Sequence, residues 1–67
     1  MSVARVTEIT SSSKKSFEDA IEKGVKRSAE TLDNVTSAWV QDQEVAVADG
    51  KIKEYRVKMK VTFILRD

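Results

Sequence analysis

The fold is decided by residues 55–65, YRVKMKVTFIL, where apolar and polar side chains alternate with a period of two. Such alternation is typical of a strand with one buried face and one face open to solvent. At ~3.3 Å per residue this stretch would span ~35 Å, well beyond the usual ~17–20 Å strand. We therefore expect the sheet to curl around another element or to be covered by neighbouring chains.

This strand is the second arm of a long β-hairpin that we expect to run from Asn34 to Arg66. The turn is Ala-Asp-Gly-Lys, residues 48–51, because its glycine can take a positive φ at no steric cost. In the first arm, Asp42 falls in register with the apolar residues before it, whereas the valines after it fall in the opposite register. A β-bulge between Asp42 and Glu44 would return the apolar side chains to one face.

Before the hairpin, the sequence predicts one amphipathic helix of roughly 18 residues. Its apolar and small residues recur at i, i+3, i+4 and i+7 spacing: Phe17, Ala20, Ile21, Gly24, Val25, Ser28, Ala29 and Leu32. The N-cap is either Ser13, or Ser16 in a capping box with Asp19, and Asp33-Asn34 ends the helix. Because glycine costs ~1 kcal/mol relative to alanine inside a helix, Gly24 is expected where the helix backbone approaches the sheet closely.

A first strand is expected from Val3 to Thr10, mainly because of its β-branched residues. A right-handed crossover through the helix makes the first two strands parallel, and the hairpin makes the last two antiparallel. The last strand alternates most cleanly and is expected in the centre. The prediction is an α+β fold of order β-α-β-β, with a three-stranded antiparallel sheet in the order 1-3-2 wrapped around one helix. In its core, Phe17, Ile21, Val25, Ala29 and Leu32 should face Val57, Met59, Val61 and Phe63.

The composition excludes several classes of function. Without Cys and His, the chain has no disulfides, no usual zinc site and no His-based acid–base catalysis. No nucleophile–base pair can be assembled, so we do not expect an enzyme. Twelve basic and eleven acidic residues are interspersed, and a net charge of +1 does not indicate a nucleic-acid partner. No apolar run could cross a bilayer and no secretory signal is visible, so we expect a cytoplasmic protein without a membrane partner.

Self-association is expected from the size of the chain. A domain of 67 residues lies near the limit at which core burial and chain entropy cancel. One helix covers only part of a three-stranded sheet, which leaves an outer face that carries Trp39, Gln41, Gln43, Arg56, Lys58 and Lys60. Trp and Arg are enriched at the energetic centres of protein interfaces.

Five segments, taken together, resemble the dodecin family. They are residues 2–9 (SVARVTEI), 11–17 (SSSKKSF), 30–35 (ETLDNV), 53–57 (KEYRV) and 61–63 (VTF). The resemblance covers essentially the whole chain and implies a single dodecin-like domain over residues 1–67. It also implies a hollow homododecamer that binds a flavin, riboflavin or FMN, between its subunits. Dodecins are regarded as non-enzymatic flavin storage and protection proteins.

The resemblance also implies which residues would contact the flavin. Aligned on residues 54–57, the family's flavin-stacking Trp falls at Ser37, and the Gln that pairs with the polar edge of the flavin falls at Arg56. Asp42 matches an acidic position that contacts the flavin side chain in some members. The Gly usual in the loop before the helix is Ser11 in this chain.

Trp39 and Gln41 complete the candidate flavin site, because Ser37, Trp39 and Gln41 share one face of a strand. Trp39 lies two strand residues, ~6–7 Å, from the family's stacking position. Its ring could still stack on a flavin that is displaced by this distance. It could instead anchor an interface by stacking on Arg or on a symmetry mate. Arg56 can donate hydrogen bonds to a flavin carbonyl, although unlike Gln it cannot accept one from the ring N–H.

A flavin-free dodecameric shell with an ion-binding or structural role is the alternative. Copies of Asp42 or Glu44 around a symmetry axis could form an oxygen-rich site for a divalent cation such as calcium or magnesium. The acidic patch of Glu18, Asp19 and Glu22 is interpreted as a solvated face that favours the helix dipole.

Overall fold

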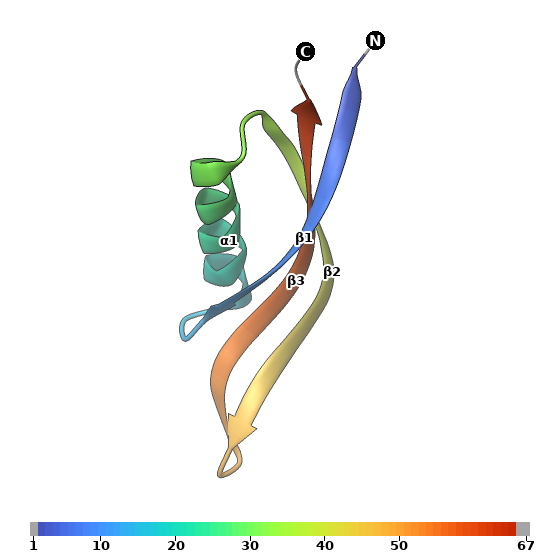
Figure 1. Ribbon diagram of the computed structural model, residues 1–67. Coiled ribbons are helices and arrows are strands. Elements are labelled where there is room, and N and C mark those ends of the chain that lie inside the picture. Colours follow the sequence, from blue (N-terminus) through green and yellow to red (C-terminus); the bar gives the residue numbers. More distant parts are fainter. Residues whose placement is uncertain (1, 66–67) are drawn as a thin grey trace.

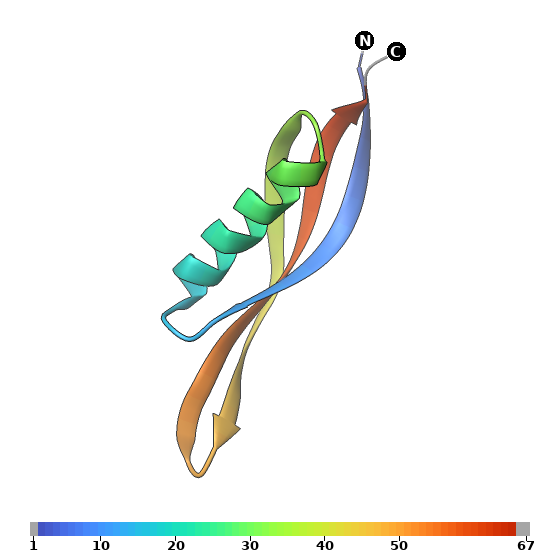
Figure 2. The ribbon, with the colours of Figure 1, turned by 60° about the vertical axis from the view of Figure 1, so that its left-hand side comes forward.

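Four elements follow one another in the computed structural model, which describes residues 2–65: β1 (Val3–Ser13), α1 (Phe17–Thr31), β2 (Val35–Ala48) and β3 (Lys51–Leu65). β3 pairs antiparallel with both other strands, so the sheet has the order β1-β3-β2. The twisted sheet carries α1 on one face (Figure 1, Figure 2). The predicted fold class and strand order are confirmed, while Arg66, the expected end of the hairpin, lies outside the described residues.

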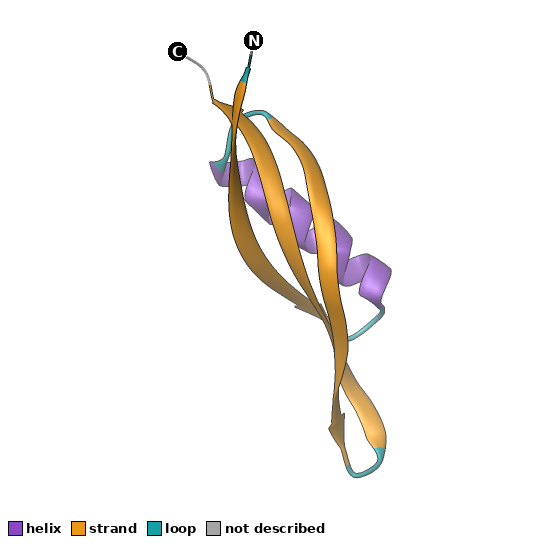
Figure 3. Cartoon of the chain, turned by 90° about the vertical axis from the view of Figure 1, so that its right-hand side faces the viewer, coloured by secondary structure: helices purple, strands orange, loops and turns teal. Residues whose placement is uncertain are grey.

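The β-hairpin extends well past the helix. The molecule measures 51 × 19 × 13 Å along its principal axes. A helix of 15 residues spans ~22 Å at ~1.5 Å per residue, less than half of that length. Figure 3, seen from the sheet side, shows the helix behind one half of the strands only. The free end of the hairpin, called the hairpin arm below (residues 45–54), is therefore not covered by the helix.

The first strand and the helix start are joined by a network of three short side chains. β1 continues to Ser13, three residues beyond the expected end, so Ser13 is not the N-cap. Ser16 is the N-cap, and its hydroxyl accepts the backbone N–H of Asp19 at 3.0 Å. Ser13 instead donates from its hydroxyl to the Asp19 carboxylate at 2.5 Å. The capping-box alternative therefore predicted the correct N-cap, Ser16. In a capping box the acidic side chain accepts from the backbone N–H of the N-cap, whereas here the Asp19 carboxylate accepts from Ser13 of β1.

The other two connections, from α1 to β2 and from β2 to β3, contain residues with positive φ. The Leu32 N–H donates to the Ser28 carbonyl at 2.9 Å and closes the helix, which ends two residues before the expected Asp33-Asn34. Asn34 then takes a φ of 61°, which turns the chain into β2. In the hairpin turn, Asp49 and Gly50 have φ values of 53° and 71°. Two consecutive positive φ values are those of a type I′ turn, so the predicted role of Gly50 is confirmed.

The core lies between α1 and the inner face of β3. Val57, Met59 and Val61 are at most 1% exposed, as the alternation predicts. The helix presents its small residues to them, because its buried residues are Ala20, Gly24 and Ser28. The predicted helix side of the core was therefore wrong in part. Phe17 and Ile21 pack against this core as expected, whereas Ala29 is exposed.

Gly24 lies at the closest approach of helix and sheet, as predicted. A Cβ at this position would lie 2.5 Å from the Met59 methyl carbon and 3.0 Å from the Ser11 Cβ. A side chain at this position would require Met59 and Ser11 to move. The small-residue stripe of the helix thus lets its backbone sit directly on β1 and β3.

The register of β2 shifts at Gln41, and the expected position of the β-bulge was wrong. Val40 pairs with Met59 and Asp42 pairs with Lys58, so Gln41 is the extra residue. The bulge lies before Asp42 and not between Asp42 and Glu44. This difference moves Asp42 from the helix side, where the alternation had put it, to the side of Lys58. A carboxylate is thereby kept out of the apolar core.

Candidate functional site

The sheet face turned away from α1, called the outer face below, is built around the polar residues of β3. Arg56, Lys58, Lys60 and Thr62 alternate with the buried residues of that strand. Residues paired across antiparallel strands project from the same face, so each has a β2 partner on the outer face. The pairs are Glu44 with Arg56, Asp42 with Lys58, Trp39 with Lys60 and Ser37 with Thr62.

Arg56 is the most strongly bound cation of this face. Its Nε donates to the Glu54 carboxylate at 2.7 Å, and one terminal nitrogen lies 3.8 Å from Glu44. The hydrogen bond that Arg56 donates to Glu54, together with the charge of that carboxylate, raises the pKa of Arg56 above its ordinary value. The Arg56 side chain is still 45% exposed, and its guanidinium has further N–H donors for a ligand.

Trp39 is the largest exposed aromatic group of the outer face. The residue is 64% exposed, although aromatic rings are among the side chains that gain most from burial. The Lys60 ammonium lies 5.8 Å from the ring centroid, within the range of a cation–π contact. An exposed electron-rich ring is thus held beside a cation.

A cleft of about 380 Å³ opens between β2 and β3 around Arg56. Asp42, Gln43, Glu44 and Lys58 line it together with Arg56, Val57 and Thr10. It is polar along its rim, since cations and carboxylates alternate across the strands. Lys58 also lies 4.0 Å from Glu8 on β1, so acidic side chains flank the central basic stripe on both sides.

The predicted site residues fall into two groups on this face. Asp42 and Arg56 line the same cleft, whereas Ser37 and Trp39 pair with Thr62 and Lys60 further along the sheet. Lys60 follows Arg56 by four residues, so the two groups are ~13 Å apart along the strand.

Gln41 is the half-buried extra residue of the bulge and has no partner on β3. It lies in sequence between the two groups of the candidate site. Glu54 was not singled out from the sequence, although it precedes Arg56 by two residues, the spacing that places two strand residues on one face.

The described residues define no metal centre or membrane span of their own. Within residues 2–65, no group of three or more carboxylates is close enough to hold a metal ion. The helix of the described chain is too short and too polar to cross a bilayer.

The comparisons with known proteins match this fold along nearly its whole length. Residues 3–66 match the family model Dodecin. The chain belongs to the dodecin family. This dodecin is 39% identical over 67 residues to the calcium dodecin of Mycobacterium tuberculosis, a match that covers 98% of the chain and 93% of the relative.

Solved dodecin structures superpose closely on the chain. The dodecin from Streptomyces davaonensis gives a TM-score of 0.93 at 33% identity, over 98% of this chain and 97% of that one. The calcium dodecin of Mycobacterium tuberculosis, described as a calcium-chelating antigen with a novel calcium-binding site, gives 0.83 at 37% identity, over 96% and 91%. The recognition made from the five sequence segments is therefore confirmed.

Proposed function

We propose that this dodecin is a non-enzymatic binding protein that holds a flavin, riboflavin or FMN, on its outer face between subunits, for storage or protection. The observation that carries the proposal is Trp39, an aromatic residue 64% exposed on a face that also presents the partly exposed side chain of Arg56. A flat aromatic ligand would bury this ring, and offset stacking adds ~0.5–1.5 kcal/mol beyond the burial of area.

Arg56 is proposed to orient the flavin. Its remaining N–H groups suit the carbonyl oxygens at the polar edge of the ring system. The Glu54 and Glu44 carboxylates hold the guanidinium in place, which lowers the conformational entropy that it would lose on binding. Asp42, in the same cleft, is proposed to contact the side chain of the flavin.

Self-association into a homododecamer completes the proposal, because one chain offers only one wall of a flavin site. Large apolar side chains are exposed at both ends of the sheet: Val3, Val6, Val45, Val47, Ile52 and Leu65, between 37% and 62%. Val45, Val47 and Ile52 belong to the hairpin arm, which no helix covers. A chain of 67 residues gains from covering these groups with copies of itself.

The flavin proposal is tested by titrating riboflavin and FMN into the purified protein while following the fluorescence of the flavin. We expect saturable quenching, and we expect Trp39→Ala to weaken it. Val47→Ala is the matched control, since it also removes an exposed apolar side chain but lies on the hairpin arm. Absence of quenching at high micromolar flavin would refute the flavin function.

Calcium is a second candidate ligand, supported by one feature of the outer face. Asp42 has no ion pair within 4 Å among the described residues, although Lys58 is its partner across the strands. A carboxylate free of cations can contribute to a calcium site, which takes 6–8 oxygen ligands. Because residues 2–65 of one chain hold no such cluster, the site would be shared between subunits. The 39% identical relative carries the name calcium dodecin.

Calcium binding is tested by calorimetric titration of the metal-free protein. We expect Asp42→Asn to abolish the binding heat, while Glu44→Gln, whose carboxylate already pairs with Arg56, retains most of it. Equal loss in both variants, or no heat in the parent, would exclude Asp42 as the ligand that defines the site.

A further inference from the structure

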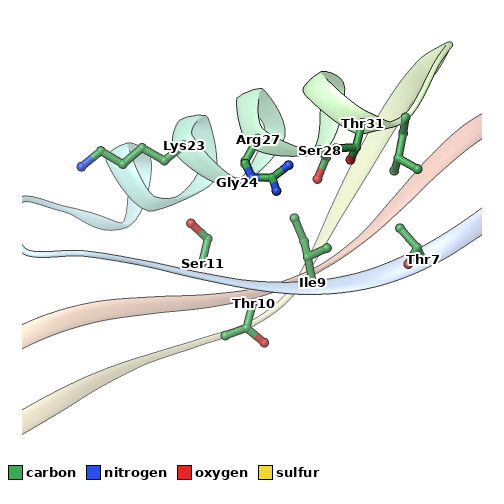
Figure 4. A pocket seen from close by; sticks show the side chains of 10 residues that line it. Thr7, Ile9, Thr10, Ser11, Lys23, Gly24, Arg27, Ser28 and Thr31 are labelled. Carbon is green, nitrogen blue, oxygen red and sulfur yellow. The ribbon is translucent and has the colours of Figure 1, made fainter.

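A second cavity lies on the other side of the sheet, between β1 and α1. It is a groove of about 540 Å³ lined by Thr7, Ile9, Thr10, Ser11, Lys23, Gly24, Arg27, Ser28, Thr31 and Leu32. Figure 4 shows Ser28 and Thr31 reaching from the helix toward β1, while Ile9 and Ser11 reach up from the strand. Its volume lies within the ~300–1,000 Å³ typical of small-molecule sites. None of the candidate flavin residues lines it.

The walls of this groove carry hydroxyls that the fold does not use. Ser28 is 6% exposed, and its side chain has no hydrogen-bond partner among the described residues. The side chains of Thr7, Ser11 and Thr31 likewise make no hydrogen bond within residues 2–65. No side-chain oxygen in this part of the chain is both sealed from solvent and unpaired, so the Ser28 hydroxyl opens into the groove. A nearly buried hydroxyl without a partner is costly unless water or a ligand satisfies it.

Arg27 supplies a charge that no carboxylate of residues 2–65 compensates. One turn earlier, Lys23 is held by Asp19 at 3.1 Å. Arg27 has no carboxylate within 4 Å in the described residues. Its planar guanidinium presents paired N–H donors that match two oxygens of a phosphate or carboxylate. The groove thus combines one free guanidinium with several hydroxyl donors.

We propose that this groove binds a small organic phosphate, with the phosphate at Arg27 and Ser28. A phosphate has three terminal oxygens, which accept hydrogen bonds from both a guanidinium and neighbouring hydroxyls. The apolar part of the ligand would lie on Ile9 and Leu32, the two large apolar residues that line the groove. This site is separate from the outer face and goes beyond the proposed flavin and calcium functions.

The proposal is tested by calorimetry on the full chain in its native assembly, with phenyl phosphate, inorganic phosphate and phenol as probes. We expect phenyl phosphate to bind more tightly than inorganic phosphate, and phenol not to bind. Arg27→Ala should weaken phenyl phosphate binding about ten- to hundredfold, the range for a hydrogen bond to a charged group. Ser28→Ala should weaken it about tenfold or less.

Two matched variants make this test selective. Lys26→Ala removes a neighbouring exposed cation that does not line the groove, and it should leave the affinity nearly unchanged. Arg27→Lys keeps the charge but loses the planar pair of donors, so its affinity should fall between those of the parent and Arg27→Ala. Circular dichroism checks that every variant folds.

Several results would overturn the proposal. One is equal affinity in Arg27→Ala and Lys26→Ala, which would mean that phosphate binds through overall charge. A second is an affinity for phenyl phosphate no greater than for inorganic phosphate. The third is absence of binding at millimolar phenyl phosphate, as expected if a neighbouring subunit fills the groove.

Discussion

Gly24 brings the helix backbone close to two residues of the sheet, Met59 and Ser11. In Gly24→Ala, the new methyl would clash with the Met59 side chain and with Ser11. Overpacking costs ~1–3 kcal/mol, which outweighs the ~1 kcal/mol that alanine gains in helix propensity. We expect a lower free energy of unfolding in urea. In a Met59→Ala background the same change should cost less, because the contact with Met59 is gone and only the contact with Ser11 remains. An equal loss of stability in both backgrounds would contradict this account.

The hydrogen bond between Ser13 and Asp19 shifts the pKa of Asp19, which makes the stability of the fold depend on pH. Donation from Ser13, followed by the contact with Lys23, lowers the pKa of Asp19 below its ordinary value of 3.8. A carboxyl with a lowered folded-state pKa stabilises the fold above the unfolded-state value, and this stabilisation is lost as pH falls through the folded-state value. We expect Ser13→Ala to raise the pKa of Asp19, measured from its carboxyl carbon shift by NMR. Ser12→Ala is the control, and an unchanged titration in Ser13→Ala would rule out the assigned cause.

The candidate flavin contacts can also be tested residue by residue. The alignment on residues 54–57 predicts that Ser37 takes the position of the family's stacking Trp, and Ser37→Trp would add a second aromatic surface to the outer face. Combined with Arg56→Gln, which can both donate to and accept from the flavin edge, it should strengthen flavin binding about tenfold. The measurement is the dissociation constant from fluorescence quenching. An unchanged or weaker affinity would show that the flavin does not lie at these residues.

At the scale of the element, the bulge of β2 decides which side chains share a face. Deleting Gln41 should leave Val40 opposite Met59 and Asp42 opposite Lys58, because only the extra residue is lost. Deleting Gln43 should instead move the residues after it to the opposite face and turn Glu44 inward. We therefore expect deletion of Gln43 to lower the thermal unfolding midpoint more than deletion of Gln41. The reverse order would mean that the bulge itself holds the sheet together.

The elements themselves could be predicted, because each rests on a short-range pattern. The alternation of residues 55–65 predicted the buried row of β3, and Ala-Asp-Gly-Lys at residues 48–51 predicted the hairpin turn. The bulge position escaped prediction because an extra residue at Gln41 or one at Gln43 restores the apolar face equally well. Only the pairing with β3 selects between them.

For the helix face and the outer-face contacts, too, the sequence pattern predicted the element but not which side chains meet. The helix pattern contained both Ala20-Gly24-Ser28 and the bulkier residues beside them, and periodicity alone could not say which row lies nearest the sheet. The buried row is the small one, because Met59 occupies the space beneath Gly24. That Trp39 shares the outer face with Lys60 followed from the alternation. Its pairing with Lys60 depends on the strand register, and the ion pairs of Arg56 depend on side-chain conformations.

At the scale of the whole molecule, the shape of one chain leaves much of its apolar surface open. The helix spans less than half of the 51 Å length of the molecule, and Val47 and Ile52 of the hairpin arm are each more than half exposed. The outer face and the hairpin arm are therefore the surfaces that a homododecamer would cover. This arrangement would also place the two walls of each flavin site on different subunits.

The central claim, a flavin held between subunits of a dodecamer, is tested most directly by sedimentation velocity of the protein mixed with FMN. Absorbance is followed both in the protein band and in the visible band of the flavin. We expect both signals to sediment together in one particle of about 90 kDa, twelve times the 7.5 kDa chain. Flavin left behind in the supernatant, or a protein boundary at the mass of a monomer or dimer, would contradict it.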